Sequence, residues 1–144
     1  MTNYLKGMTA GLIATLVLSA LMVMKAMMGV MPGLDLPAMI AGMMGMSGTP
    51  IVGWVAHFMI GIVLYGVAIV LSTPLLPGVG PIVRGVIVGV LGWLVMMVML
   101  MPMAGVGMFG MHFGIMAPMM TLVLHLIFGA VLGWYYGRTV RSPA

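Results

Sequence analysis

Residues 125–137 read HLIFGAVLGWYYG, and this stretch decides the fold class of the chain. It is apolar along its length, begins with a histidine and then carries a glycine at every fourth position. Residues four apart share one face of an α-helix, and small residues at this spacing let two helices approach closely within a bilayer. The stretch therefore predicts a transmembrane helix that packs along a glycine face.

The composition of the whole chain indicates the same environment. Of its 144 residues only 4% are charged, whereas a soluble domain carries about 25% charged residues. Four apolar stretches, roughly 5–28, 51–72, 82–103 and 118–138, each have the ~20 residues that a helix needs to cross a bilayer. The first stretch is too long for the apolar core of a signal peptide and is expected to be retained. We therefore expect an all-α, polytopic membrane protein, with one four-helix bundle over residues 1–144.

The few charged side chains predict the orientation of this bundle. Four of the five cations fall at the N-terminus, in the middle loop or at the C-terminus: Lys6, Arg84, Arg138 and Arg141. Because positive residues stay on the cytoplasmic side, we expect both termini in the cytoplasm of a bacterium and the helices in its inner membrane. Lys25 lies near the outer end of the first helix, and its long stem is expected to let the ammonium reach the outer membrane–water interface. Asp35, followed by Leu and Pro, predicts a short interfacial helix over residues 36–46.

The chain also carries an internal repeat. At an offset of 68 positions His57 matches His125, Pro50 matches Pro118 and Gly61 matches Gly129. At an offset of 78 positions Gly7 matches Gly85 and Gly11 matches Gly89. These pairs predict a duplicated helical hairpin, about 1–72 and about 82–138, with a pseudo-two-fold axis along the membrane normal. The glycines expected to line the helix contacts are Gly7, Gly11, Gly61, Gly85, Gly89, Gly129, Gly133 and Gly137.

Two histidines lie within the predicted membrane helices, and such residues are candidates for function. His57 and His125 share one depth by the repeat, roughly 10 Å below the outer surface at 1.5 Å per helical residue. One interpretation is structural, with each ring bonded to a carbonyl or hydroxyl across the bundle. The other interpretations are a pair of ligands for haem b or a metal ion, or a proton relay.

Methionine is the compositional outlier, with 22 residues that cluster towards the predicted outer face. Thioether sulfur is a soft ligand suited to Cu(I), so the candidate copper ligands are His57, His125, Met24, Met28, Met101 and Met103. The competing interpretation is that methionine is an adaptable apolar filler, suited to a surface that binds a partner.

Several function classes find no support in the sequence. There is no cysteine and one carboxylate, Asp35, so thiol chemistry and paired acid–base catalysis are excluded within this chain. Five scattered cations are too few for a nucleic-acid surface. We therefore expect a non-catalytic protein in the lipid bilayer. Its role would be that of an accessory or structural subunit of a larger membrane complex, such as a respiratory one, or of a self-associating protein. The alternatives are a haem- or copper-binding protein and, less favoured by the sequence, a small oligomeric transporter.

Two segments carry a resemblance to a known family. Residues 53–66, GWVAHFMIGIVLYG, and residues 101–137 contain the His-x-x-x-Gly pairs His57/Gly61 and His125/Gly129, together with MPMAG at 101–105 and GIMAP at 114–118. In these features the chain resembles a family of small bacterial four-helix integral membrane proteins classed as a domain of unknown function. The resemblance covers nearly the whole chain. It implies the fold and a bacterial membrane location, and it brings no known activity.

Overall fold

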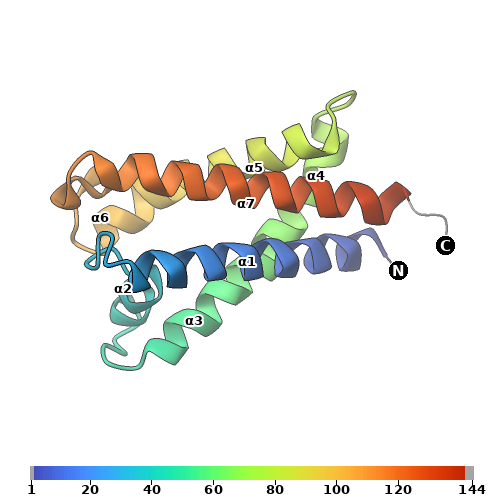
Figure 1. Cartoon of the computed structure of the whole chain (residues 1–144). Helices are drawn as coiled ribbons and strands as arrows, with labels where there is room; N and C mark the ends of the chain where they lie inside the picture. The colour runs from blue at the N-terminus through green and yellow to red at the C-terminus, as the bar shows by residue number, and fades with distance from the viewer. Residues whose placement is uncertain (1, 142–144) are drawn as a thin grey trace.

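The computed structural model describes residues 2–141, and every regular element in that range is helical (Figure 1). The elements are α1 (Asn3–Met27), α2 (Leu36–Met43), α3 (Pro50–Met59), η1 (Ile60–Tyr65), α4 (Gly66–Leu75), α5 (Pro81–Val95), η2 (Met96–Leu100), α6 (Met101–Met103), η3 (Met108–Phe113) and α7 (Met116–Arg141). Of the short segments, η1 and η2 are π-helical and η3 is a 3-10 helix.

Four long helices dominate the described range. α3, η1 and α4 run on as one helix, Pro50–Leu75, which we call the second span, and α5, η2 and α6 form the third span, Pro81–Met103. With α1 and α7 they give four helices that are long and apolar enough to cross a membrane. The predicted all-α fold with four such helices is confirmed, and the predicted boundaries agree to within about three residues of the observed ones.

The short helix after the first loop also begins where the sequence predicts. α2 starts at Leu36, and the carboxylate of Asp35 accepts a hydrogen bond of 3.1 Å from the backbone N–H of Ala38. This side chain supplies the acceptor that the first turn of a helix lacks. α2 packs against α3, where the backbone of Gly53 lies against the carbonyl of Pro37.

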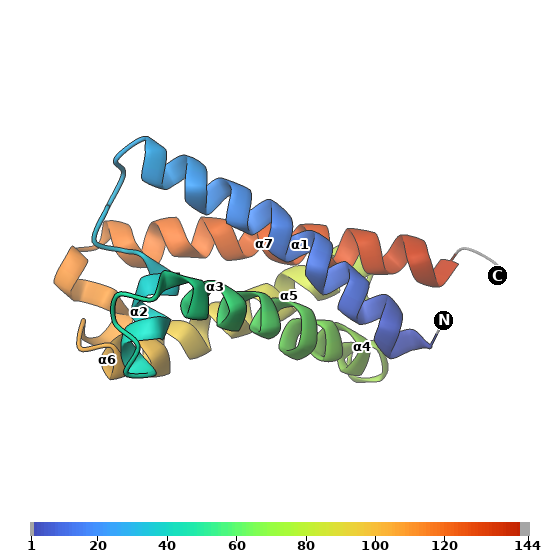
Figure 2. The same cartoon turned by 90° about the horizontal axis from the view of Figure 1, so that it is seen from below.

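The four long helices are arranged as two hairpins that meet along α1 and α7. α1 contacts the second span and α7, while α7 also contacts the third span (Figures 1 and 2). The second and third spans contact each other mainly through α4 and α5. A regular two-fold arrangement would give these two spans the contact that α1 makes with α7. The structure departs from the expected pseudo-two-fold arrangement in this respect.

The two ends of the bundle differ in chemistry. α1 begins and α7 ends at the same end, which also holds the connection between α4 and α5 (Figure 1). We call it the basic end, because it carries Lys6, Arg84, Arg138 and Arg141. The opposite end, formed by α2, α6, η3 and the connections around them, is the methionine end. At the basic end the Arg84 guanidinium donates hydrogen bonds to the carbonyls of Leu76 and Val79, at 3.2 and 2.9 Å, and so holds the middle loop.

The eight glycines selected from the sequence all lie where helix backbones meet. Gly11 faces the carbonyl of Gly61, and Gly85 faces that of Gly129, so a side chain at either place would overlap the neighbouring helix. The remaining contacts are Gly7 with Gly66, Gly89 with the carbonyl of His125, and Gly133 and Gly137 with Pro81.

A π-helical turn sets the register of the second span against α1. Gly61 and Gly66 are five residues apart, and both lie against α1, facing Gly11 and Gly7. In a regular α-helix residues five apart point about 140° away from each other. A π turn brings residues i and i+5 onto one face, so η1 aligns the two glycines.

The core is divided along the length of the bundle. One cluster joins α1, α4, α5 and α7 and includes Leu18, Ile69, Phe128 and Leu132. In it the Tyr65 and Phe128 rings pack edge to face, with centroids 4.7 Å apart. The second cluster lies at the methionine end and is built from Leu34, Met96, Met97, Met101 and Ala117. The interior therefore changes from aliphatic and aromatic to sulfur-rich towards that end.

Candidate functional site

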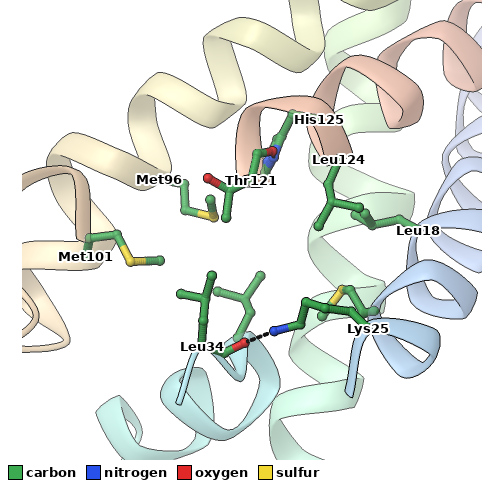
Figure 3. Close-up of a pocket in the computed structure, with 10 residues that line it drawn as sticks. Leu18, Lys25, Leu34, Met96, Met101, Thr121, Leu124 and His125 are labelled. Atoms are coloured by element: carbon green, nitrogen blue, oxygen red, sulfur yellow. Dashed lines mark hydrogen bonds between the residues drawn. The ribbon is translucent and has the colours of Figure 1, made fainter. Parts of the chain in front are cut away.

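A small cavity lies between the two core clusters. Its volume is about 50 Å³, and it is lined by α1, the connection to α2, the start of α2, η2, α6 and α7 (Figure 3). The lining residues are Leu18, Met22, Lys25, Leu34, Leu36, Met96, Met101, Thr121, Leu124 and His125. A water needs roughly 10–15 Å³ of such space, so the cavity has room for a few waters or one metal ion.

α7 contributes the polar side of the cavity. The Thr121 hydroxyl donates a hydrogen bond of 2.7 Å to the carbonyl of Ala117, one turn earlier in the same helix. The same oxygen accepts a bond of 3.1 Å from the indole N–H of Trp93 on the third span. Thr121 is therefore fixed by two helices, and it is 7% exposed.

His125 lies one turn after Thr121 and has a defined tautomer. Its Nδ1 is 2.8 Å from the carbonyl oxygen of Thr121. A carbonyl can only accept, so Nδ1 carries the proton and Nε2 of the neutral ring keeps a free lone pair. Among residues 2–141, no hydrogen bond to Nε2 is found. An imidazole held in this way is oriented to bind a ligand through Nε2.

The third span contributes two thioethers through its π-helical segment. Met96 begins η2 and Met101 directly follows it, and the N–H of Met101 donates to the carbonyl of Met96. The π turn brings these residues, five apart, onto one face, and both side chains line the cavity (Figure 3). Both are buried, at 8% and 1% exposure. Met22, from α1, supplies the third sulfur of the lining.

Lys25 is the charged residue of the lining, and its ammonium is already bonded. Nζ donates to the carbonyl oxygen of Leu34 at 2.7 Å (Figure 3) and to that of Met31 at 3.1 Å. The sequence predicts that this side chain reaches the outer interface, and the membrane boundary that would test this is not part of the structure. Its ammonium bonds to the connection between α1 and α2, and Lys25 and Leu34 both line the cavity.

His57 lies outside the set of residues that line the cavity. It is 6% exposed and packs edge to face against Trp54 and Phe58, and its Nε2 has no hydrogen-bond partner within residues 2–141. The structural interpretation expected both rings to bond across the bundle. In the part of the chain that the structure describes, His125 bonds within its own helix, and no bond is found for Nε2 of His57.

The structure brings together part of the copper-ligand set expected from the sequence. His125 and Met101 share the cavity, whereas Met24, Met28 and Met103 are turned outward, at 53%, 72% and 73% exposure. Sequence reasoning missed Met22 and Met96. The signal for Met96 is its five-residue spacing from Met101, which indicates a shared face only if the helix has a π turn.

The size and donors of the cavity limit what it can hold. Pockets for drug-sized ligands measure about 300–1,000 Å³, so a cavity of about 50 Å³ does not fit a haem. Within residues 2–141, no three or more His, Cys, Asp or Glu side chains are grouped closely enough to hold a metal ion. The side-chain donors of the cavity are therefore one imidazole, one hydroxyl and three thioethers, besides the bonded ammonium of Lys25.

Comparisons with known proteins give one match. A family model described as a family of unknown function (DUF6789) matches residues 1–144. No curated protein and no solved structure matches the chain.

Proposed function

Since the chain belongs to DUF6789, a family of unknown function, we propose its role from its own geometry: a non-catalytic integral membrane protein that serves as an accessory subunit of a larger membrane complex. The observation that carries this proposal is the apolar surface of the methionine end. Beyond the four long helices, a connection between spans is expected to meet water and to be polar. Here the exposed residues of the connections include Met28, Met44, Met46, Met108 and Met111.

Such a surface is suited to a protein partner. A contiguous apolar patch exposed to water marks an interaction site, and flexible thioether side chains adapt to an opposing surface. The charged residue of these connections is Asp35, and its carboxylate already caps α2. We therefore propose that the partner is a membrane protein with an apolar face at the same depth as the methionine end. Self-association is the alternative outcome of the test.

The membrane in question, on this proposal, is a bacterial inner membrane with the basic end in the cytoplasm. The support is the grouping of Lys6, Arg84, Arg138 and Arg141 at one end, since positive residues remain cytoplasmic. Arg138 also lies over the Trp134 ring, 5.0 Å from its centroid, as expected of an interfacial aromatic belt.

The duplication of a hairpin is part of the same proposal. Its support is that equivalent glycines meet in both halves: Gly11 lies against Gly61, and Gly89 lies against Gly129. These two contacts are related by the offsets of the sequence repeat. The limited contact between the second and third spans then reflects divergence after the duplication.

The accessory role is tested by native mass spectrometry of the protein extracted gently from the membrane of its host. The expected result is a complex with other polypeptides in fixed ratio. The double variant Met28→Gln, Met108→Gln is expected to release them, because it makes the methionine end polar. Val140→Gln, an exposed position at the basic end, is the matched control and should retain the complex. A partner-free monomer from wild-type membranes would contradict the proposal.

A further inference from the structure

We propose that the cavity between α1, η2, α6 and α7 is a binding site for a single Cu(I) ion. Its ligands are Nε2 of His125 and the thioether sulfurs of Met22, Met96 and Met101. This site goes beyond the accessory role and stands independently of it, because its ligands are buried or partly buried residues and not the exposed methionines on which the accessory role rests.

A hydrogen bond within α7 orients the ring of His125 for metal binding. The ring is 9% exposed, and its Nδ1–H is donated to the carbonyl of Thr121. Histidines that bind metals through Nε2 characteristically donate the other ring N–H to a carbonyl or carboxylate, which fixes the tautomer and the ring orientation. The bond to Thr121 therefore leaves Nε2 unprotonated without any metal being required to displace a proton.

The sulfur donors decide which metal the site would take. Thioethers are soft ligands that select Cu(I), and imidazole also suits copper. Mg²⁺ and Ca²⁺ require oxygen ligands, and structural Zn²⁺ sites use thiolates, imidazoles and carboxylates. The lining holds neither a carboxylate nor a thiolate. Of the common biological metals, Cu(I) is the ion that this donor set matches.

Charge and size favour the monovalent ion further. All four proposed ligands are neutral, and the lining includes the ammonium of Lys25. Coulomb repulsion from that ammonium is twice as large for Cu(II) as for Cu(I) at the same distance. The bonds from Nζ to the carbonyls of Met31 and Leu34 direct the ammonium to the connection between α1 and α2. The volume of about 50 Å³ suffices for one ion without a hydration shell.

The surroundings of the site are already in place. Thr121, whose carbonyl orients His125, is bonded through its hydroxyl to Trp93 of the third span. Met96 and Met101 are aligned by the π turn of η2. π turns are frequently found at functional sites, and here the turn brings two methionine side chains to one cavity.

The test is an anaerobic titration of the purified full chain in detergent with Cu(I), in competition with a chromogenic Cu(I) chelator. The wild type is expected to bind one Cu(I) per chain. Met101→Leu, Met96→Leu and His125→Leu should each weaken binding by about tenfold or more, since even a group that only orients a ligand contributes 10–100-fold to metal affinity. Met28→Leu and Met103→Leu, which alter exposed methionines, are the matched controls and should bind as the wild type does.

Two outcomes would overturn the site. One is the absence of a one-equivalent binding event in the wild type. The other is a loss of binding that follows Met28→Leu or Met103→Leu and not the interior variants. Leucine and methionine have similar volumes, so the methionine variants are expected to fold. Should one fail to fold, X-ray absorption of the Cu(I)-loaded wild type decides: sulfur neighbours with one nitrogen support the site, and oxygen and nitrogen neighbours alone refute it.

Discussion

The ammonium of Lys25 lies 2.7 Å from the carbonyl oxygen of Leu34 and ties the last turn of α1 to the connection that follows it. A second bond, to Met31, closes the same connection. Met31 has a positive φ of 47°, a conformation that is strained for a residue other than glycine. The lysine therefore holds a backbone turn that would otherwise open readily.

Lys25→Met should loosen this connection while leaving the helices in place. Removal of hydrogen bonds from a charged donor costs about 1–3 kcal/mol, so the free energy of local opening over residues 28–35 is expected to fall by that amount. Hydrogen exchange of the backbone amides measures it. Lys6→Met, at the basic end, removes a charge of the same kind from the opposite end and should leave this exchange unchanged.

Gly85→Ala should destabilise the hairpin of the third span and α7. The added methyl group would meet the carbonyl of Gly129 and the backbone of Gly133, neither of which can rotate away. Such overpacking costs about 1–3 kcal/mol, measurable as a lower free energy of unfolding in a detergent titration. At Gly80 an added methyl group meets open space, so Gly80→Ala is the control. Equal stability of the two variants would show that the helices are not in this close contact.

His57→Leu is expected to raise the stability of the protein. The buried Nε2 of His57 has no hydrogen-bond partner among the described residues 2–141, and an unpaired buried polar atom costs about 1–3 kcal/mol. Leucine fills a similar space without that cost. By contrast, Trp93→Phe removes a donor that is bonded to Thr121 and should lower stability. If His57→Leu lowered the free energy of unfolding instead, the ring would have a partner in the folded protein, such as a ligand.

The orientation of the bundle can be measured by labelling single introduced cysteines. The chain has no cysteine of its own, so the wild type gives no background labelling. Ser47→Cys places a thiol on an exposed residue of the methionine end, and Thr2→Cys places one at the basic end. In intact cells stripped of their outer membrane, an impermeant maleimide is expected to label Ser47→Cys alone. Thr2→Cys should react only after the membrane is opened. The reverse pattern would place the basic end outside.

Much of the fold could be predicted because the signals for it are local. Runs of apolar residues separated by proline and glycine fixed α1, the two composite spans and α7, and Asp35 marked the start of α2. Glycine spacing indicated which helix faces would meet, because residues without a side chain let two helix backbones approach closely. The hydrogen bonds of Lys25, by contrast, could not be predicted. Its partners are backbone carbonyls, which every residue carries, so no residue type in the sequence identifies them.

The candidate site could be predicted only in part, because its geometry depends on an irregular turn, the π turn η2. With regular α-helical periodicity Met96 and Met101 face about 140° apart, so they do not suggest a common site. Exposure was also invisible from the sequence: Met101 and Met103 are two residues apart, and one is buried while the other is exposed.

The π turns η1 and η2 also affect how the chain can change in length. Each holds one residue more than an α-helical turn, so deleting a single residue within 60–65 or 96–100 would restore a regular helix instead of breaking it. The part of the span beyond the deletion would rotate by about 100°. Such a deletion would turn Gly66 away from α1, or Met101 away from Met96, while hydropathy and helix length stayed almost the same. An insertion or deletion of one residue at these turns therefore changes more buried contacts than most substitutions do, although the hydropathy profile of the chain stays almost the same.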